Sequence, residues 1–281
     1  MRNNKNIVWL ASYPKSGNTW VRIFLSNYLS NSNNPVDINS LEKSPIFSNR
    51  VTFDEYSPIF SSDLKPEEID KIRNEVYIQI AKNLKNLQLF KIHDSLYKTH
   101  DDKLIVPSKH TFGAVYIIRN PLDIAVSFAF HSKITFQKSC DFICNPNSVF
   151  STSINKMDNQ IRQILNSWSG HVISWTEQKE FPILIIKYED LIHNAKENFE
   201  KILNFLKVPI NNEKLLQSLE FSSFKELQNQ EKKYGFKEKP IKAETFFRKG
   251  ESNAWKKELS KKQSEQIINS NFEVMQKYHY I

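Results

Sequence analysis

Near the start of the chain, a group of polar residues stands where a predicted strand gives way to a predicted helix. Residues 7–11 form a short apolar run typical of a buried strand, and apolar side chains over residues 20–29 recur at helical spacing. The turn between them contains Lys15, Ser16, Gly17, Asn18 and Thr19. A helix start presents backbone N–H groups to an anion, and a glycine lets the backbone approach closely. With one cation and three polar side chains added, the turn predicts a phosphate-binding loop.

This loop differs from that of the nucleotide triphosphatases, which reads Gly-x-x-x-x-Gly-Lys-Ser/Thr and holds Mg²⁺ through its last residue. Here Lys15 precedes Gly17, and Gly17 is the first glycine of the chain. The sequence also offers no acidic cluster for a metal ion. A metal-dependent transfer of a γ-phosphate is therefore poorly supported, and no metal is expected.

A second anion site is expected after the strand predicted at residues 114–118. Arg119 follows this strand, and Ser127 lies two helical turns further on, on the same face of the helix that Pro121 begins. A guanidinium and a hydroxyl can hold one phosphate by charge-assisted hydrogen bonds. The alternative is an ordinary helix N-terminus in which Arg119 pairs with Asp123.

Three segments of the chain resemble the signatures of one family, the sulfotransferases that use 3′-phosphoadenosine 5′-phosphosulfate (PAPS). Residues 13–20 match the family's Tyr-Pro-Lys-Ser-Gly-Thr-Thr-Trp except at Asn18. Residues 119–127 are similar to the second signature, and residues 248–250, Arg-Lys-Gly followed by Trp255, are similar to the third. The segments stand in family order and at family-like distances, so the resemblance covers nearly the whole chain.

The predicted elements and the resemblance both indicate the α/β class, as a single sulfotransferase domain over residues 1–281 with a central, mainly parallel sheet flanked by helices. Further strands are expected at residues 89–93, 97–100 and 183–187. Helices are expected at residues 66–87, 121–131, 158–178 and 195–206. Strands that alternate with helices form right-handed crossovers, and such sheets bind ligands at the carboxyl ends of their strands.

The resemblance implies that PAPS binds across these strand ends, with its 3′-phosphate on Arg119 and Ser127. Arg248 and Lys249 supply two more cations there, and Gly250 lets the backbone approach. Many relatives continue with Gly-Asp before the tryptophan of the third signature, whereas this chain has Asn and Ala at residues 253–254.

The resemblance also assigns residues to the adenine ring. Trp20 and Phe224 correspond to the aromatic side chains that sandwich it, and Tyr188 corresponds to a tyrosine near it. Ser222 aligns with a family threonine that contacts the base. The alternative for each aromatic residue is an ordinary place in the core.

Sulfuryl transfer is an in-line displacement, so catalysis rests on positioning, electrostatics and removal of the acceptor's proton. Lys15 is the natural cation for charge that grows on the leaving phosphate, and it can reach Ser127. The base is expected to be a histidine, because its ordinary pKa suits neutral pH.

Of the seven histidines, His100 is the candidate base, because it ends Lys98-Thr99-His100 at a predicted strand end. Family members carry their catalytic histidine in the same Lys-Thr-His setting, and Lys98 would neutralise the moving sulfuryl oxygens. The alternative is a surface histidine beside solvated acids, since residues 101–102 are both Asp. No role is assigned to His93, His131 or His171.

The acceptor is expected to be a small molecule with a hydroxyl or an amine. It would enter between residues 31–62, which look mostly irregular, the region of Cys140, and residues 225–247, which are expected to form a mobile lid. Phenylalanines in these loops favour an apolar or aromatic acceptor, whereas the two Asp residues after His100 favour a cationic one.

The net charge of +8 favours anionic partners, yet no run of Lys or Arg is long enough for a nucleic-acid arm.

Two cysteines indicate a reduced protein, and no apolar run approaches the 20 or so residues of a membrane span, so a cytoplasmic protein is expected. The oligomeric state is left open, because residues 260–261 do not match the centre of the family's dimer motif.

Two other functions are weighed. One is a small-molecule kinase that uses ATP and Mg²⁺, which the loop sequence disfavours. The other is a non-catalytic protein of the same fold that binds polyanions, which the set of Lys15, His100, Arg119 and Ser127 disfavours.

Overall fold

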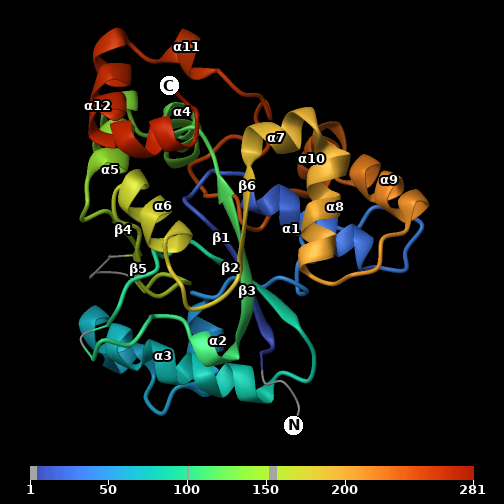
Figure 1. Ribbon diagram of the computed structural model, residues 1–281, viewed down its shortest axis with the longest axis vertical. Helices are drawn as coiled ribbons and strands as arrows, with labels where there is room; N and C mark the ends of the chain where they lie inside the picture. Colours follow the sequence, from blue (N-terminus) through green and yellow to red (C-terminus); the bar gives the residue numbers. More distant parts are fainter. Residues whose placement is uncertain (1–4, 100, 152–156) are drawn as a thin grey trace. The chain divides into compact units, whose positions relative to one another are not determined.

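A computed structural model describes residues 5–99, 101–151 and 157–281 (Figure 1). The strands are β1 (Ile7–Ser12), β2 (Gln88–Ile92), β3 (Thr111–Ile118), β4 (Val149–Phe150), β5 (Gln163–Ile164) and β6 (Ile183–Lys187). The helices are α1 (Asn18–Tyr28), α2 (Arg50–Tyr56), α3 (Pro66–Asn83), α4 (Pro121–Ser132), α5 (Phe136–Cys144), α6 (Trp168–Thr176), α7 (Tyr188–His193), α8 (Ala195–Phe205), α9 (Asn212–Phe221), α10 (Phe224–Tyr234), α11 (Trp255–Glu258) and α12 (Lys261–Lys277). Two short 3₁₀ turns are η1 (Ser61–Asp63) and η2 (Ser108–His110). In the described ranges, no helix is both long and apolar enough to cross a membrane.

A parallel four-stranded sheet with the order β2-β1-β3-β6 confirms the predicted α/β class. β1 pairs with β2 in a register that sets Ile7 opposite Gln88 and Ala11 opposite Ile92. Every residue of β1 is buried, as its unbroken apolar run predicts for an inner strand of a parallel sheet. The carboxyl ends of β1 and β2 therefore meet at one edge, next to Ser12.

The chain divides into two compact units. Unit 1 comprises Met1–Tyr13, Pro45–Tyr116 and Asn145–Ile185, and unit 2 comprises Pro14–Ser44, Ile117–Cys144 and Ile186–Ile281. In unit 1, Trp9, Phe47, Tyr77 and Phe90 form an aromatic core, with Trp9 and Phe47 ring centroids 4.4 Å apart. In unit 2, α4 packs on α5, α11 and α12, while α9 packs on α1 and α8 (Figure 1).

Residues 31–62 are mostly irregular, as predicted, apart from η1 and from α2, which begins where the Asn49 side chain accepts from the Thr52 backbone N–H. Two other sequence predictions differ from the fold. The helix expected at residues 158–178 starts only at Trp168, because residues 163–164 pair with β4 and Ser167 caps α6.

The strand expected at residues 97–100 is also wrong for its described part. Lys98 forms only an isolated bridge with Leu104, outside the sheet. The backbone turns back at Asp102, which has a φ of 56°, and Thr99 N–H donates to Lys103 O at 2.7 Å. The Lys-Thr segment thus belongs to a hairpin and not to a strand end of the sheet.

Candidate functional site

The predicted phosphate loop lies in unit 2 and leads directly into α1. Gly17 stands at the N-cap with a φ of 99°, and a Cβ there would come within 2.6 Å of Tyr188 Cδ2. Lys15 also has a positive φ, of 69°, a conformation that costs a non-glycine residue energy and is common at functional sites. No side chain of the described residues caps α1, and its first turn holds no acid. The start of α1 is therefore chemically suited to an anion, and the phosphate contact stays a prediction.

Arg119 joins the three signature segments. It is only 8% exposed, and its Nη1 donates to Lys15 O at 2.8 Å while its Nη2 donates to Glu251 O at 3.1 Å. Its guanidinium carbon lies 4.2 Å from the ring centroid of Tyr188. One buried cation thus holds the first loop, the third loop and the start of α7 together, a structural role in addition to the predicted phosphate contact.

Asp123, in the first turn of α4, anchors the third signature loop. Its two carboxylate oxygens accept from the backbone N–H groups of Asn253, at 2.8 Å, and Trp255, at 3.1 Å. Asn253 has a φ of 65°, a conformation that Asn adopts more readily than most residues. The departure from glycine at this position therefore keeps the shape of the turn.

The cations of the third loop face acidic side chains. Arg248 Nη1 lies 3.8 Å from Glu258 Oε1, and Lys249 Nζ lies 3.3 Å from Glu251 and 3.9 Å from Glu258. Gly250 has a φ of 65°, and a Cβ there would come within 2.6 Å of Phe224 Cδ2. The loop backbone thus packs directly on the Phe224 ring.

Lys15 contacts His131, a residue with no predicted role. Its Nζ lies 3.1 Å from His131 Nδ1 and 4.3 Å from the ring centroid of Phe246. His131 lies one turn beyond the half-buried Ser127 on α4. The i, i+4 spacing from Ser127 is the signal that could have pointed to it.

The aromatic candidates Trp20 and Phe224 are both partly buried and pack against one apolar cluster. The buried members of that cluster are Ile23, Ile38, Leu41, Leu227, Phe236 and Phe247. Tyr188 is largely buried, which raises its pKa above the ordinary value despite the nearby Arg119, so its phenol stays neutral. Ser222 is fully buried, and its Oγ donates to Ser218 O at 2.7 Å. Its contact with a base stays a prediction.

The stretch predicted as a lid is helical up to Tyr234 and is then tied to α1. Arg22, buried in α1, donates from Nη1 to both Glu238 carboxylate oxygens, at 2.7 and 2.9 Å, and from Nε to Ser44 O. Lys237 N–H donates to Asn39 Oδ1 at 2.7 Å.

The thiol of Cys140 is buried, and burial raises its pKa to about 12.

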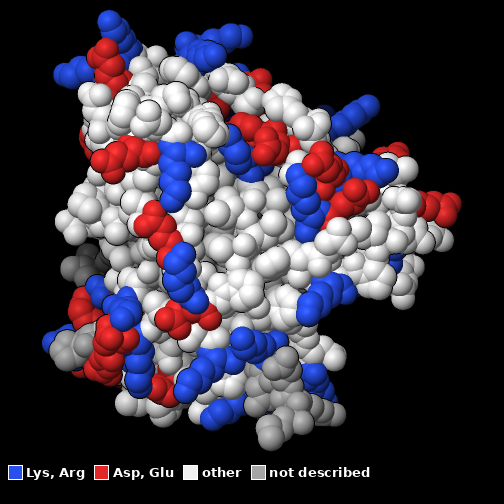
Figure 2. Space-filling model, in the orientation of Figure 1, with Lys and Arg blue, Asp and Glu red and all other residues white. Residues whose placement is uncertain are grey.

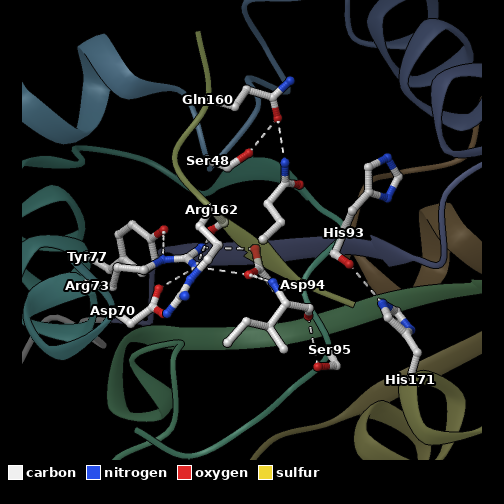
Figure 3. Close-up of polar contacts among 12 residues, drawn as sticks. Ser48, Asp70, Arg73, Tyr77, His93, Asp94, Ser95, Gln160, Arg162 and His171 are labelled. Atoms are coloured by element: carbon white, nitrogen blue, oxygen red, sulfur yellow. Dashed lines mark hydrogen bonds and ion pairs between the residues drawn. The ribbon is translucent and has the colours of Figure 1, made fainter. Parts of the chain in front are cut away.

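Unit 1 carries a buried polar network directly after β2 (Figure 3). Arg73 donates to both oxygens of Asp94 at 2.9 Å, and Ile164 N–H donates to the same carboxylate at 3.1 Å. Arg73 also donates to Tyr77 Oη at 2.8 Å. A second arginine, Arg162, pairs with Asp70 beside this group. The network fixes the backbone at residue 94.

His93, just before Asp94, is held at the carboxyl ends of β1 and β2. Its Nδ1 lies 2.8 Å from Ser12 O, and its own carbonyl accepts from His171 Nε2 at 3.0 Å (Figure 3). Burial lowers the pKa of His171 to about 4, so this ring is neutral and Tyr116 Oη donates to its Nδ1 at 2.8 Å. The sequence assigned no role to either histidine.

Lys98 lies on the surface of unit 1 and donates to Asp102 Oδ1 at 2.8 Å. Its side chain is 56% exposed, and the bond to Asp102 raises its pKa. His100, the predicted base, lies outside the described residues. The hairpin shows that one premise for His100, a place at a strand end, does not hold for its neighbours.

On the face shown in Figure 2, Lys and Arg side chains lie in separate groups, most of them beside Asp or Glu, with uncharged residues between the groups. The basic composition is therefore not gathered on this face into one continuous cationic field, as a nucleic-acid groove would require.

Over nearly its full length, the chain matches the model of a family of group-transfer enzymes. The family model described as the sulfotransferase domain matches residues 5–279, and the chain belongs to this family.

Curated relatives are found in mammals. Mouse sulfotransferase 1 family member D1 is 28% identical over 268 residues, which cover 92% of this chain and 80% of the relative. Dog sulfotransferase 1A1 is 28% identical over 263 residues, with 92% and 79% covered.

Solved structures share the fold. Mouse sulfotransferase SULT7A1, complexed with PAP, superposes with a TM-score of 0.63 at 20% identity, covering 96% of this chain and 84% of that one. Retinol dehydratase in complex with androsterone and PAP gives a TM-score of 0.60 at 17% identity, with 98% and 81% covered.

Proposed function

We propose that the protein transfers a sulfuryl group from PAPS to the hydroxyl or amine of a small acceptor. The observation that carries the proposal is the convergence of three signature segments on Arg119 within unit 2. A sulfotransferase structure with PAP bound shares the fold, which supports PAPS as the co-substrate.

The residues of unit 2 fit such a nucleotide. Ser16 Oγ and Arg119 Nε are buried and have no hydrogen-bond partner within the described part of the chain, so each can satisfy a phosphate oxygen. At Gly17 and Gly250, a Cβ would collide with the rings of Tyr188 and Phe224, so glycine lets both loops pack directly on aromatic side chains that the resemblance assigns to the nucleotide. When bound, PAPS would supply the sulfuryl group that is transferred.

Each part of the site would then have one task. The loop with Lys15 would hold the 5′ end, and Arg119, Ser127 and residues 248–250 would hold the 3′-phosphate. Lys15 would stabilise charge that develops on the leaving phosphate. Trp20 and Phe224 would flank the adenine, as the resemblance implies.

The acceptor proton would be taken by a histidine, and two histidines compete for this role. His100 has the Lys-Thr-His setting of the family. The position of His93 favours it, because His93 follows β2 and contacts Ser12. Ser12 precedes Lys15 by three residues in the chain. Donation of Nδ1–H to the Ser12 carbonyl makes Nε2 the basic nitrogen of the neutral ring, as general-base catalysis needs.

Calorimetric titration with 3′,5′-adenosine bisphosphate (PAP) tests the proposal, with AMP and ATP–Mg²⁺ as controls. Micromolar or tighter binding of PAP with much weaker binding of AMP is expected, because Arg119 and the third loop read the 3′-phosphate. A preference for ATP–Mg²⁺ would favour the kinase, and salt-dependent polyanion binding without turnover would favour the non-catalytic binder.

The base is assigned by comparing His93→Ala with His100→Ala in a PAPS turnover assay. The variant that lacks the base should lose about 100-fold or more in kcat with PAP affinity retained. A near-normal rate in either variant removes that histidine from the role.

A further inference from the structure

The partner that the structure gives to Lys15 lies outside the three signatures. We propose that His131 positions the Lys15 ammonium through its Nδ1 atom, so that the cation is set before any nucleotide arrives. The inference rests on the proposed function, because Lys15 matters to the reaction only if sulfuryl transfer takes place.

Lys15 Nζ is held from two sides within unit 2. Its first neighbour is His131 Nδ1 at 3.1 Å, and its second is the face of Phe246, whose centroid is 4.3 Å away. The two neighbours also touch each other edge to face, with ring centroids 5.5 Å apart at 77°. An ammonium group is attracted by both an acceptor nitrogen and an aromatic face.

Both neighbours are themselves fixed. Phe246 and the residue after it donate their backbone N–H groups to the buried Glu231 carboxylate, at 2.6 and 2.9 Å. α4, which carries His131, is tied to α5 where Ser139 Oγ donates to Ala125 O at 2.7 Å. A fixed acceptor on a helix can therefore impose one position on the end of a flexible side chain.

The contact also determines the form of the imidazole. An ammonium only donates, so His131 Nδ1 must carry the lone pair, and in the neutral ring the proton resides on Nε2. A lysine stem has four rotatable bonds, and an unrestrained charge would be averaged over many positions. Pre-placing the charge is worth most where it must meet a transition state, because misplacement by about 1 Å can cost about 100-fold in rate.

Three substitutions of His131 test whether its role depends on the hydrogen-bond acceptor or only on the size of the side chain. His131→Ala removes the acceptor. In His131→Asn the amide oxygen reaches the place of Nδ1, and in His131→Gln it reaches the place of Nε2 instead. We expect kcat to fall by about 10- to 100-fold in the Ala and Gln variants and to recover most of the way in the Asn variant. The Kd of PAP should stay within about threefold in all of them, since many other contacts hold the nucleotide.

A second readout needs no turnover. In nucleotide-free protein with ¹⁵N-labelled histidine, His131 should show an unprotonated Nδ1 and a protonated Nε2, and Lys15→Met should remove this preference. A protonated Nδ1 in the wild type, or a His131→Ala variant with normal kcat, would overturn the inference. Equal losses in the Ala and Asn variants would also overturn it, since they would indicate bulk alone.

The two proposals can fail separately. A wild type that binds no PAP and transfers no sulfuryl group defeats the proposed function, while the nitrogen spectra still decide whether His131 holds Lys15. A wild type that turns over, with His131→Ala equally fast, defeats only the role of His131.

Discussion

His171 should make the protein less stable in mild acid. The ring is fully buried, donates to His93 O and accepts from Tyr116 Oη, and burial lowers its pKa from 6.5 to about 4. Below pH 6.5 the unfolded chain binds a proton that the folded chain refuses, so stability falls as the pH falls toward 4. Between pH 7.5 and pH 5, this one group should lower the free energy of unfolding by about 2 kcal/mol.

Urea denaturation at the two pH values measures the effect. His171→Gln keeps a donor and an acceptor but cannot titrate, so its loss between pH 7.5 and pH 5 should be smaller than that of the wild type by about 2 kcal/mol. The exposed His279 gives a matched control, because His279→Gln also removes one histidine but from the surface. An unchanged pH dependence in His171→Gln would refute the reasoning.

Three further substitutions test other contacts. Arg73→Met leaves the buried Asp94 carboxylate without its cation, so the free energy of unfolding should fall by about 3–5 kcal/mol in urea denaturation; a loss under about 1 kcal/mol would contradict a buried pair. Glu258→Gln removes a carboxylate that faces both cations of the third loop, so the Kd of PAP should fall severalfold at low salt and the gain should shrink as salt rises. An unchanged Kd by calorimetry would show that Glu258 does not compete with the nucleotide. Asp123→Asn loses charge-assisted acceptance from two loop amides, so PAP should bind about 10-fold more weakly while AMP changes little; equal effects on both nucleotides would argue against a role through the third loop.

The parts of the fold that depend on local pattern could be predicted from the sequence. The strand at β6, the buried β1 and the start of α4 at Pro121 follow from apolar runs and from a proline at a helix start, and all are confirmed. The predicted helix at residues 158–178 failed because residues 163–164 pair with β4, a contact that no local periodicity reveals.

The candidate site could be predicted only where a motif carries it. The signatures led to Lys15 and Arg119, but His131 depends on the phase of α4 and on where the lysine side chain points. In the same way, the family motif directed the prediction of the base to residues 98–100, of which Lys98 and Thr99 lie in a hairpin. His93 is distinguished instead by the pairing of β1 with β2 and by a buried network. Such features arise from contacts between residues that are distant in the chain.

The position of Arg119 has a consequence for how the protein opens. Its guanidinium bonds carbonyls at residues 15 and 251 and lies on the ring of Tyr188, so three distant segments share one buried anchor. If either loop moved away, one N–H group of the buried guanidinium would lose its carbonyl acceptor. Fluctuations of the two loops should therefore be cooperative, with their backbone amides exchanging hydrogen in a single opening event and not independently. A ligand that holds either loop would then slow exchange in both.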